Sequence, residues 1–117
     1  MLPRLRHALI AAVMLLSTAC SPVTLVNALT DRSGYRLHEA VAYGDQPQQR
    51  LDVYVPRTLH VPAAVVLFIH GGRWREGSRG DYRFLAQSLT TLGIIVVVPD
   101  YRLFPQAHFP DFIVDNA

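Results

Sequence analysis

The stretch that decides the fold is residues 63–74, which read AAVVLFIHGGRW. Its first seven residues are apolar, with β-branched or aromatic side chains at odd and even positions. This pattern is typical of a strand that is buried on both faces of a parallel sheet. Gly71 and Gly72 follow, and glycine lets the backbone turn sharply and approach a ligand closely. Such a turn can leave backbone N–H groups unpaired, and groups of this kind stabilise the oxyanion that forms during acyl transfer.

A helix and a second buried strand are predicted after the glycines. Asp81 is a suitable N-cap residue, and apolar residues within 82–92 recur at spacings of three and four, which indicates one buried helix face. Gly93 fits the position just past the end of this helix. Residues 94–98 form another unbroken apolar run. Strand, helix and strand in this order predict a right-handed βαβ crossover.

Two further strands are predicted before residue 63. They are residues 39–43 and 50–55, and the turn residues 44–47 separate them. In the second strand apolar side chains alternate with Arg50, Asp52 and Tyr54, which indicates a half-buried strand. We therefore predict an antiparallel hairpin at the sheet edge. Pro56 ends it, because proline cannot donate to a strand ladder.

Residues 70–74 (HGGRW), the apolar run before them and the DYRL of residues 100–103 together resemble the α/β-hydrolase superfamily. Within it they are similar to the esterase, lipase and arylformamidase-like branch, whose oxyanion loop has this form. The resemblance covers residues 39–117. It implies an α/β fold that is the N-terminal portion of an α/β-hydrolase, with an antiparallel hairpin, a parallel βαβ unit and an incomplete sheet.

The resemblance also implies roles for the glycine loop. The backbone N–H groups of Gly72 and Arg73, in the loop that begins at Gly71, would form part of the oxyanion hole. The alternative is a turn that serves only the topology. His70 would be a structural histidine that orients the loop, because the family's base lies near the C-terminus. Trp74 would pack beneath the loop, and a role as a substrate wall is the alternative.

Charged residues near the end of the sequence are expected to support this loop. Asp100 and Arg102 are expected either to form an ion pair with each other or to bond neighbouring loops. Asp115 is expected to be solvated or locally paired, and His108 to be exposed.

The 117 residues do not include the catalytic groups of the family. The nucleophile elbow is Gly-x-Ser-x-Gly, and none of the serines lies in that motif. Ser78 comes nearest, but it has no glycine two positions before it. The five histidines show no metal-ligand spacing, so we expect no metal. The phosphate-binding glycine motif is also absent, and we expect no cofactor.

Residues 1–19 have the layout of a secretory signal peptide, with Arg4 and Arg6 before an apolar run at 8–16 and small residues at 17–19. Cys20 then resembles the acylated cysteine of a bacterial lipoprotein, although Ser17 departs from that motif; ordinary cleavage after Ala19 is the alternative. We expect export to the bacterial cell envelope or periplasm, with membrane contact only through a lipid anchor on Cys20. Residues 20–38 are expected to be a tether, with a short helical turn near residues 25–29.

The charge distribution gives no indication of a nucleic-acid partner. The formal net charge is +2, and Arg4 and Arg6 account for both units, so the chain from Cys20 onward is formally neutral.

Two functions follow as hypotheses. The first is the N-terminal part of an exported carboxylic ester hydrolase that acts on a small acyl ester by serine-dependent acyl transfer to water. This part would be inactive alone and would need a complementing C-terminal hydrolase segment. The second is a non-catalytic envelope lipoprotein that uses half a hydrolase sheet as a binding or structural module.

Overall fold

The computed structural model describes residues 21–117, so the predicted leader and the acylation of Cys20 lie outside the described residues. The elements in chain order are α2 (Pro22–Leu29), β1 (Tyr35–Ala42), β2 (Arg50–Pro56), β3 (Val65–Leu67), the 3₁₀ helix η1 (Arg79–Tyr82), α3 (Arg83–Thr90), β4 (Ile95–Pro99) and α4 (Asp111–Val114). None of the helices between residues 21 and 117 has the length and apolarity needed to cross a bilayer.

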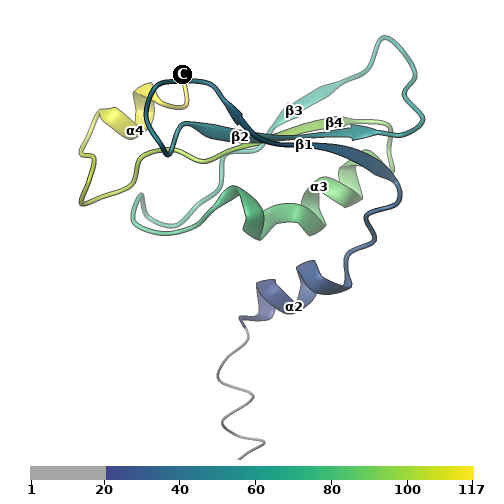
Figure 1. Cartoon of the computed structure of the whole chain (residues 1–117), viewed down its shortest axis with the longest axis horizontal. Helices are drawn as coiled ribbons and strands as arrows, with labels where there is room; N and C mark the ends of the chain where they lie inside the picture. The colour runs from purple at the N-terminus through teal and green to yellow at the C-terminus, as the bar shows by residue number, and fades with distance from the viewer. Residues whose placement is uncertain (1–20) are drawn as a thin grey trace, which may run out of the picture.

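The four strands form one mixed sheet in the order β1-β2-β4-β3 (Figure 1). Strand β2 pairs antiparallel with both β1 and β4, whereas β3 pairs parallel with β4. Helix α3 connects the two parallel strands. The predicted hairpin, the parallel βαβ unit and the incomplete α/β sheet are therefore confirmed.

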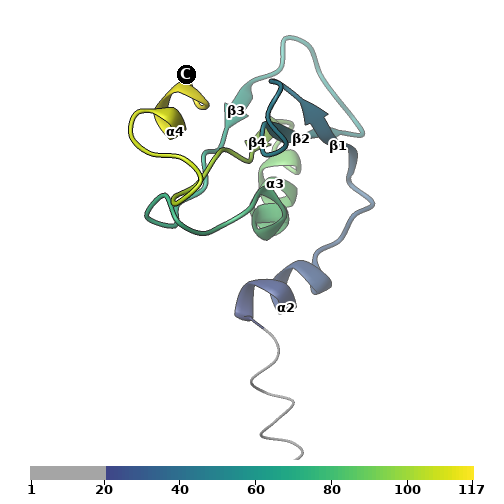
Figure 2. The ribbon, with the colours of Figure 1, turned by 60° about the vertical axis from the view of Figure 1, so that its left-hand side comes forward.

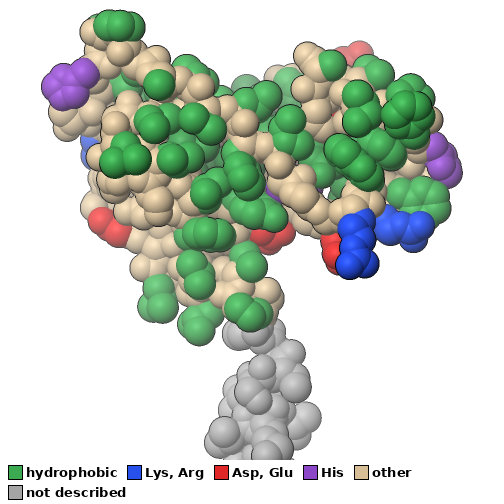
Figure 3. Space-filling model, turned by 180° about the vertical axis from the view of Figure 1, so that it is seen from behind, with side chains coloured by type: hydrophobic (Ala, Val, Ile, Leu, Met, Phe, Trp, Pro, Cys, Tyr) green, Lys and Arg blue, Asp and Glu red, His purple; other side chains and the backbone are tan. Residues whose placement is uncertain are grey.

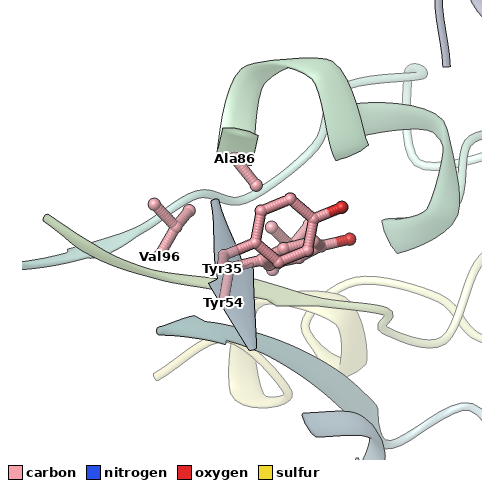
Figure 4. Close-up of a cluster of buried hydrophobic side chains, with 5 residues drawn as sticks. Tyr35, Tyr54, Ala86 and Val96 are labelled. Atoms are coloured by element: carbon pink, nitrogen blue, oxygen red, sulfur yellow. The ribbon is translucent and has the colours of Figure 1, made fainter. Parts of the chain in front are cut away.

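One face of the sheet, which we call the closed face, is covered by α3 (Figures 1 and 2). Tyr54, Val96 and Val98 are buried on this face, and Ala86 of α3 packs onto them. The rings of Tyr35 and Tyr54 meet edge to face at 5.2 Å below the helix (Figure 4). Full burial of one such side chain stabilises a fold by about 1.5–3 kcal/mol, so this cluster is the core.

The opposite face, which we call the open face, is apolar but uncovered. Val65 and Leu67 of β3 are 62% and 54% exposed. Leu67 lies beside Val97 of β4, which in turn lies beside Val53 of β2. The prediction of a strand over 63–69 that is buried on both faces is thus wrong, because β3 has three residues and two of them are exposed. Helix α4 reaches only the side of this face, where Val114 and Leu67 line one hollow.

The edge hairpin begins earlier than predicted. Strand β1 starts at Tyr35 instead of residue 39, because the buried ring of Tyr35 packs on Tyr54. A bulge between His38 and Val41 places Ala40 at φ 55°, and the Ala40 N–H donates to Asp52 Oδ1 at 2.9 Å. The segment expected to be a tether therefore contains helix α2 and the start of the sheet.

The crossover helix is shorter than predicted. It begins as η1 and continues as α3 only to Thr90, so Leu92 lies beyond it and is exposed. Asp81 is not the N-cap of α3. Its carboxylate instead accepts a hydrogen bond from the Ser78 N–H at 2.9 Å, which caps η1.

Candidate functional site

His70 is buried at the point where the chain leaves β3 and the glycine loop, residues 70–77, begins. Its ring stacks on Tyr101, with centroids 4.5 Å apart, and lies parallel to Tyr82 on the other side at 6.1 Å. The Tyr101 hydroxyl donates to the His70 carbonyl oxygen at 2.6 Å. His70 Nδ1 lies 3.0 Å from the Gly71 carbonyl oxygen. A carbonyl only accepts, so Nδ1 is protonated.

The backbone after Gly71 turns through three consecutive residues of positive φ. Gly72, Arg73 and Trp74 have φ values of 131°, 58° and 63°, and the turn closes where the N–H groups of Arg75 and Glu76 donate to the Gly72 carbonyl oxygen. Such a conformation is strained for Arg73 and Trp74 and persists only where the surroundings fix it. Strained backbone of this kind is typical of functional sites.

The N–H groups of this turn are free to bind a ligand. Among residues 21–117, the N–H groups of Gly71, Gly72, Arg73 and Trp74 donate no backbone hydrogen bond. These residues, His70 and Tyr101 line a hollow of about 240 Å³. Backbone donors at a hollow can stabilise negative charge that develops on a carbonyl oxygen.

The loop glycines have different roles. A Cβ on Gly72 would lie 1.9 Å from the Glu76 carbonyl oxygen, so the turn requires glycine there. A Cβ on Gly77 would lie 2.7 Å from His70 Nδ1, so that position also requires glycine. A Cβ on Gly71 would meet nothing within 4 Å and would point into open space.

A network of charged side chains connects the glycine loop to strands β2 and β4. Asp100 follows β4, and its carboxylate accepts hydrogen bonds from the backbone N–H and the guanidinium of Arg79. His70 Nε2 lies 3.7 Å from Asp100 Oδ1. The same Arg79 side chain also donates through Nε to Oδ1 of Asp52, at 2.8 Å, and Asp52 is buried in β2. The glycine loop is thereby tied to the centre of the sheet.

The network shifts two pKa values. Burial lowers the pKa of His70, but the Asp100 carboxylate and the Gly71 carbonyl outweigh this effect, so the pKa lies above its usual value. Burial raises the pKa of Asp100, but His70 and Arg79 outweigh it and hold the pKa below its usual range. Asp100 is therefore ionised at neutral pH, and its charge favours the protonated ring of His70.

The alternative of an ion pair between Asp100 and Arg102 is wrong. Arg102 instead donates to Asp115 after α4, with Nη2 2.7 Å from Oδ1, because the chain turns between Asp100 and Arg102 and sends the two side chains to different elements. Asp115 is buried and paired, not solvated, and its hydrogen bonds from Arg102 hold its pKa below the usual range despite burial.

Trp74 connects the loop to α4. Its ring stacks on Phe112 with centroids 4.7 Å apart and meets Tyr101 edge to face at 5.5 Å. It is 38% exposed and also lines the hollow, so it both packs and faces the site. Arg73 is exposed, as is His108, which was predicted to be so.

Sequence reasoning missed Arg79 and Tyr101. Arg79 lies in a polar loop, and no periodicity marks it as the partner of Asp100, 21 positions away. Tyr101 lies within the quoted DYRL motif, which could have drawn attention to it. Between residues 21 and 117 the structure places no three acidic, histidine or cysteine side chains together as metal ligands.

Known proteins are similar to this chain in sequence and in fold. The BD-FAE family model matches residues 51–117. The chain is 45% identical over 78 residues to a protein of Oryza sativa subsp. japonica named "Probable isoprenylcysteine alpha-carbonyl methylesterase ICME", a match that covers 67% of this chain and 19% of that one. It is 38% identical over 77 residues to esterase LipC of Mycobacterium tuberculosis, covering 64% of this chain and 19% of LipC.

The crystal structure of esterase B from Lactobacillus rhamnosis superposes with a TM-score of 0.72 at 26% identity, over 93% of this chain and 35% of that enzyme. The sequence thus spans about a fifth of the two curated relatives. The chain therefore belongs to the BD-FAE family and is the N-terminal portion of an α/β-hydrolase fold.

Proposed function

We propose that the glycine loop is the oxyanion-binding part of a serine-dependent carboxylic ester hydrolase. The observation that supports this most strongly is the run of three positive φ values at residues 72–74, which leaves consecutive N–H groups without backbone acceptors at a hollow. Two successive strained residues that are not glycine favour a functional role for the turn over a purely topological one.

The chemistry would proceed as follows. A serine oxygen bonds to the ester carbonyl carbon, and the serine proton passes to a histidine base. The π electron pair of the carbonyl moves onto the carbonyl oxygen, which becomes an oxyanion. The N–H groups of Gly72 and Arg73 donate to that oxygen. The alcohol then leaves with the proton, and water releases the acid from the acyl-enzyme. Only the backbone of Arg73 acts, because its side chain is exposed.

The serine and the histidine base would come from a complementing C-terminal segment, and residues 1–117 would be inactive alone. The open face supports this proposal, because exposed apolar strands such as β3 are normally covered or paired. Small acyl esters are the proposed substrates, since the hollow is of modest size and the relatives are named as esterases. Export to the cell envelope remains part of the proposal.

A loop graft tests the role of the backbone. Residues 70–77 of this chain would replace the structurally equivalent loop of esterase B, and hydrolysis of p-nitrophenyl butyrate would be measured. We expect the graft to retain activity. Gly71→Val, which adds a branched side chain to a residue that lines the hollow, should lower kcat/KM. Arg73→Ala, which keeps the N–H, should change kcat/KM by less than about threefold.

The graft has two outcomes that would count against the proposal. Equal activity in both variants would mean that the hollow is not where the carbonyl binds. Loss of activity in Arg73→Ala alone would mean that the side chain acts instead of the backbone. Enzyme-like turnover by the full chain on its own would contradict the need for a second segment.

A further inference from the structure

Helix α2 contacts the rest of the protein through its polar side. The Asn27 side-chain amide donates to the carbonyl oxygens of Gly80 and Asp81 at 3.0 and 2.9 Å. Its oxygen accepts from the Phe84 N–H at 3.0 Å, which caps the first turn of α3. A single amide thus fixes which side of α2 faces the domain.

The opposite side of α2 is apolar and exposed. At about 100° per residue, Leu25 and Leu29 lie nearly opposite Asn27, and Val26 lies beside Leu29 on the flank of the helix. They are 58%, 46% and 78% exposed. Figure 3 shows apolar side chains gathered over this helix at the foot of the molecule.

This orientation is the reverse of an ordinary surface helix. Such a helix buries its apolar stripe against the core and turns its polar side to water. In α2 the side chain most involved in contacts with the domain is an asparagine, and the leucines point outward. An outward apolar stripe of this kind indicates a partner that is itself apolar.

We propose that the outward side of α2, formed by Leu25, Val26 and Leu29, lies on a lipid bilayer surface. The nine-residue apolar run at 8–16 ends only five residues before α2 begins, and Cys20, the predicted acylation site, lies two residues before the helix. Six peptide steps span at most about 20 Å, so a surface that takes up that run lies within reach of α2.

The helix has no charged residue, so apolar burial and not attraction to anionic lipid would hold it at the bilayer. This inference does not depend on the proposed esterase function. It requires either that residues 8–16 are retained, as in the full chain, or that Cys20 is acylated, because cleavage after Ala19 alone removes the apolar run. It also sets the orientation of the domain. Helix α3 lies between α2 and the sheet (Figures 1 and 2), so the open face would be turned away from the lipid.

A local fluorescent probe tests the proposal in the full chain. Cys20, the single cysteine, would be replaced by serine, and one new cysteine labelled with the environment-sensitive dye NBD. The positions are Leu29 on the outward side, Thr24 on the side of the domain, and Leu92 as a matched exposed leucine elsewhere. A local readout is needed because the apolar run could bind vesicles by itself.

With phosphatidylcholine vesicles we expect a blue shift and at least a threefold rise in fluorescence at position 29, and little change at 24 and 92. Vesicles with one quarter phosphatidylglycerol should give the same result. In Asn27→Ala, position 24 should also respond, because the helix is then free to rotate about its axis.

Three outcomes would overturn the proposal. One is an unchanged signal at position 29 on addition of lipid. The second is an equal response at 24, 29 and 92 in the chain that retains Asn27. The third is a rise at position 29 that needs no lipid and grows with protein concentration, which would identify a second copy of the chain as the partner.

Discussion

The two faces of the sheet have nearly the same apolar character and very different surroundings. On the closed face, Val96 and Val98 are sealed beneath α3. On the open face, Val65 and Leu67 of the neighbouring strand are more than half exposed. The difference shows that apolar composition identifies a strand that can be buried, whereas burial itself depends on which elements are present to cover it.

The largest effect should come from placing a charge on each face in turn. Val96→Asp puts an unpaired carboxylate under α3 and should cost at least about 4 kcal/mol, which is enough to unfold the domain. Leu67→Asp should cost less than about 1 kcal/mol, because the side chain already meets water. Urea unfolding of the full chain followed by circular dichroism measures both. Similar losses from the two variants would show that the open face is covered in solution.

A smaller effect is expected at the edge of the open face, where α4 is held by the pair of Arg102 and Asp115. Arg102→Met removes the guanidinium and leaves the buried Asp115 carboxylate with hydrogen bonds only from the backbone N–H of residue 102 and from Gln49, so it should lower the unfolding midpoint. Arg36→Met, at an exposed arginine of β1, is the control and should be nearly neutral. The measurement is the unfolding midpoint at neutral pH, and a neutral Arg102→Met would mean that α4 contributes little to stability.

The glycine loop provides a matched pair of lower cost. Gly72→Ala must move the Glu76 carbonyl and adopt a strained φ, so we expect a loss of about 2 kcal/mol. Gly71→Ala should change stability by less than about 0.5 kcal/mol, because its Cβ meets open space. Thermal unfolding of both variants checks this, and equal losses would show that the turn differs from the one described.

The smallest effect is the pH dependence at His70. Because its pKa is raised in the folded state, its stabilising contribution is complete below the unfolded pKa of about 6.5. That contribution is lost as the pH rises through the folded pKa. The difference in melting temperature between the natural protein and His70→Gln should therefore shrink from pH 6 to pH 9. The lowered pKa of Asp100 acts oppositely: its contribution is present above about pH 4 and is lost on further acidification.

The sequence predicts the connectivity of this fold well, because connectivity depends on local signals. The alternation in 50–55, the apolar runs and the paired glycines indicate the hairpin, the crossover and the sharp turn. The sequence does not show which side of β2 faces the core. The fully buried side contains Asp52, and its hydrogen-bond partners Ala40 and Arg79 are distant in sequence. The partner of Asp100 was missed for the same reason. The helical turn expected at residues 25–29 proves to be the end of a longer helix that begins at Pro22.

The glycine loop is already fixed by groups within residues 21–117. His70 is clamped between two tyrosine rings, its carbonyl accepts from Tyr101, and Asp100 is fastened to Arg79. The conformational entropy of ordering this loop is therefore lost when the domain folds, and not when a substrate arrives. A ligand that meets the free N–H groups consequently binds a site that needs no rearrangement.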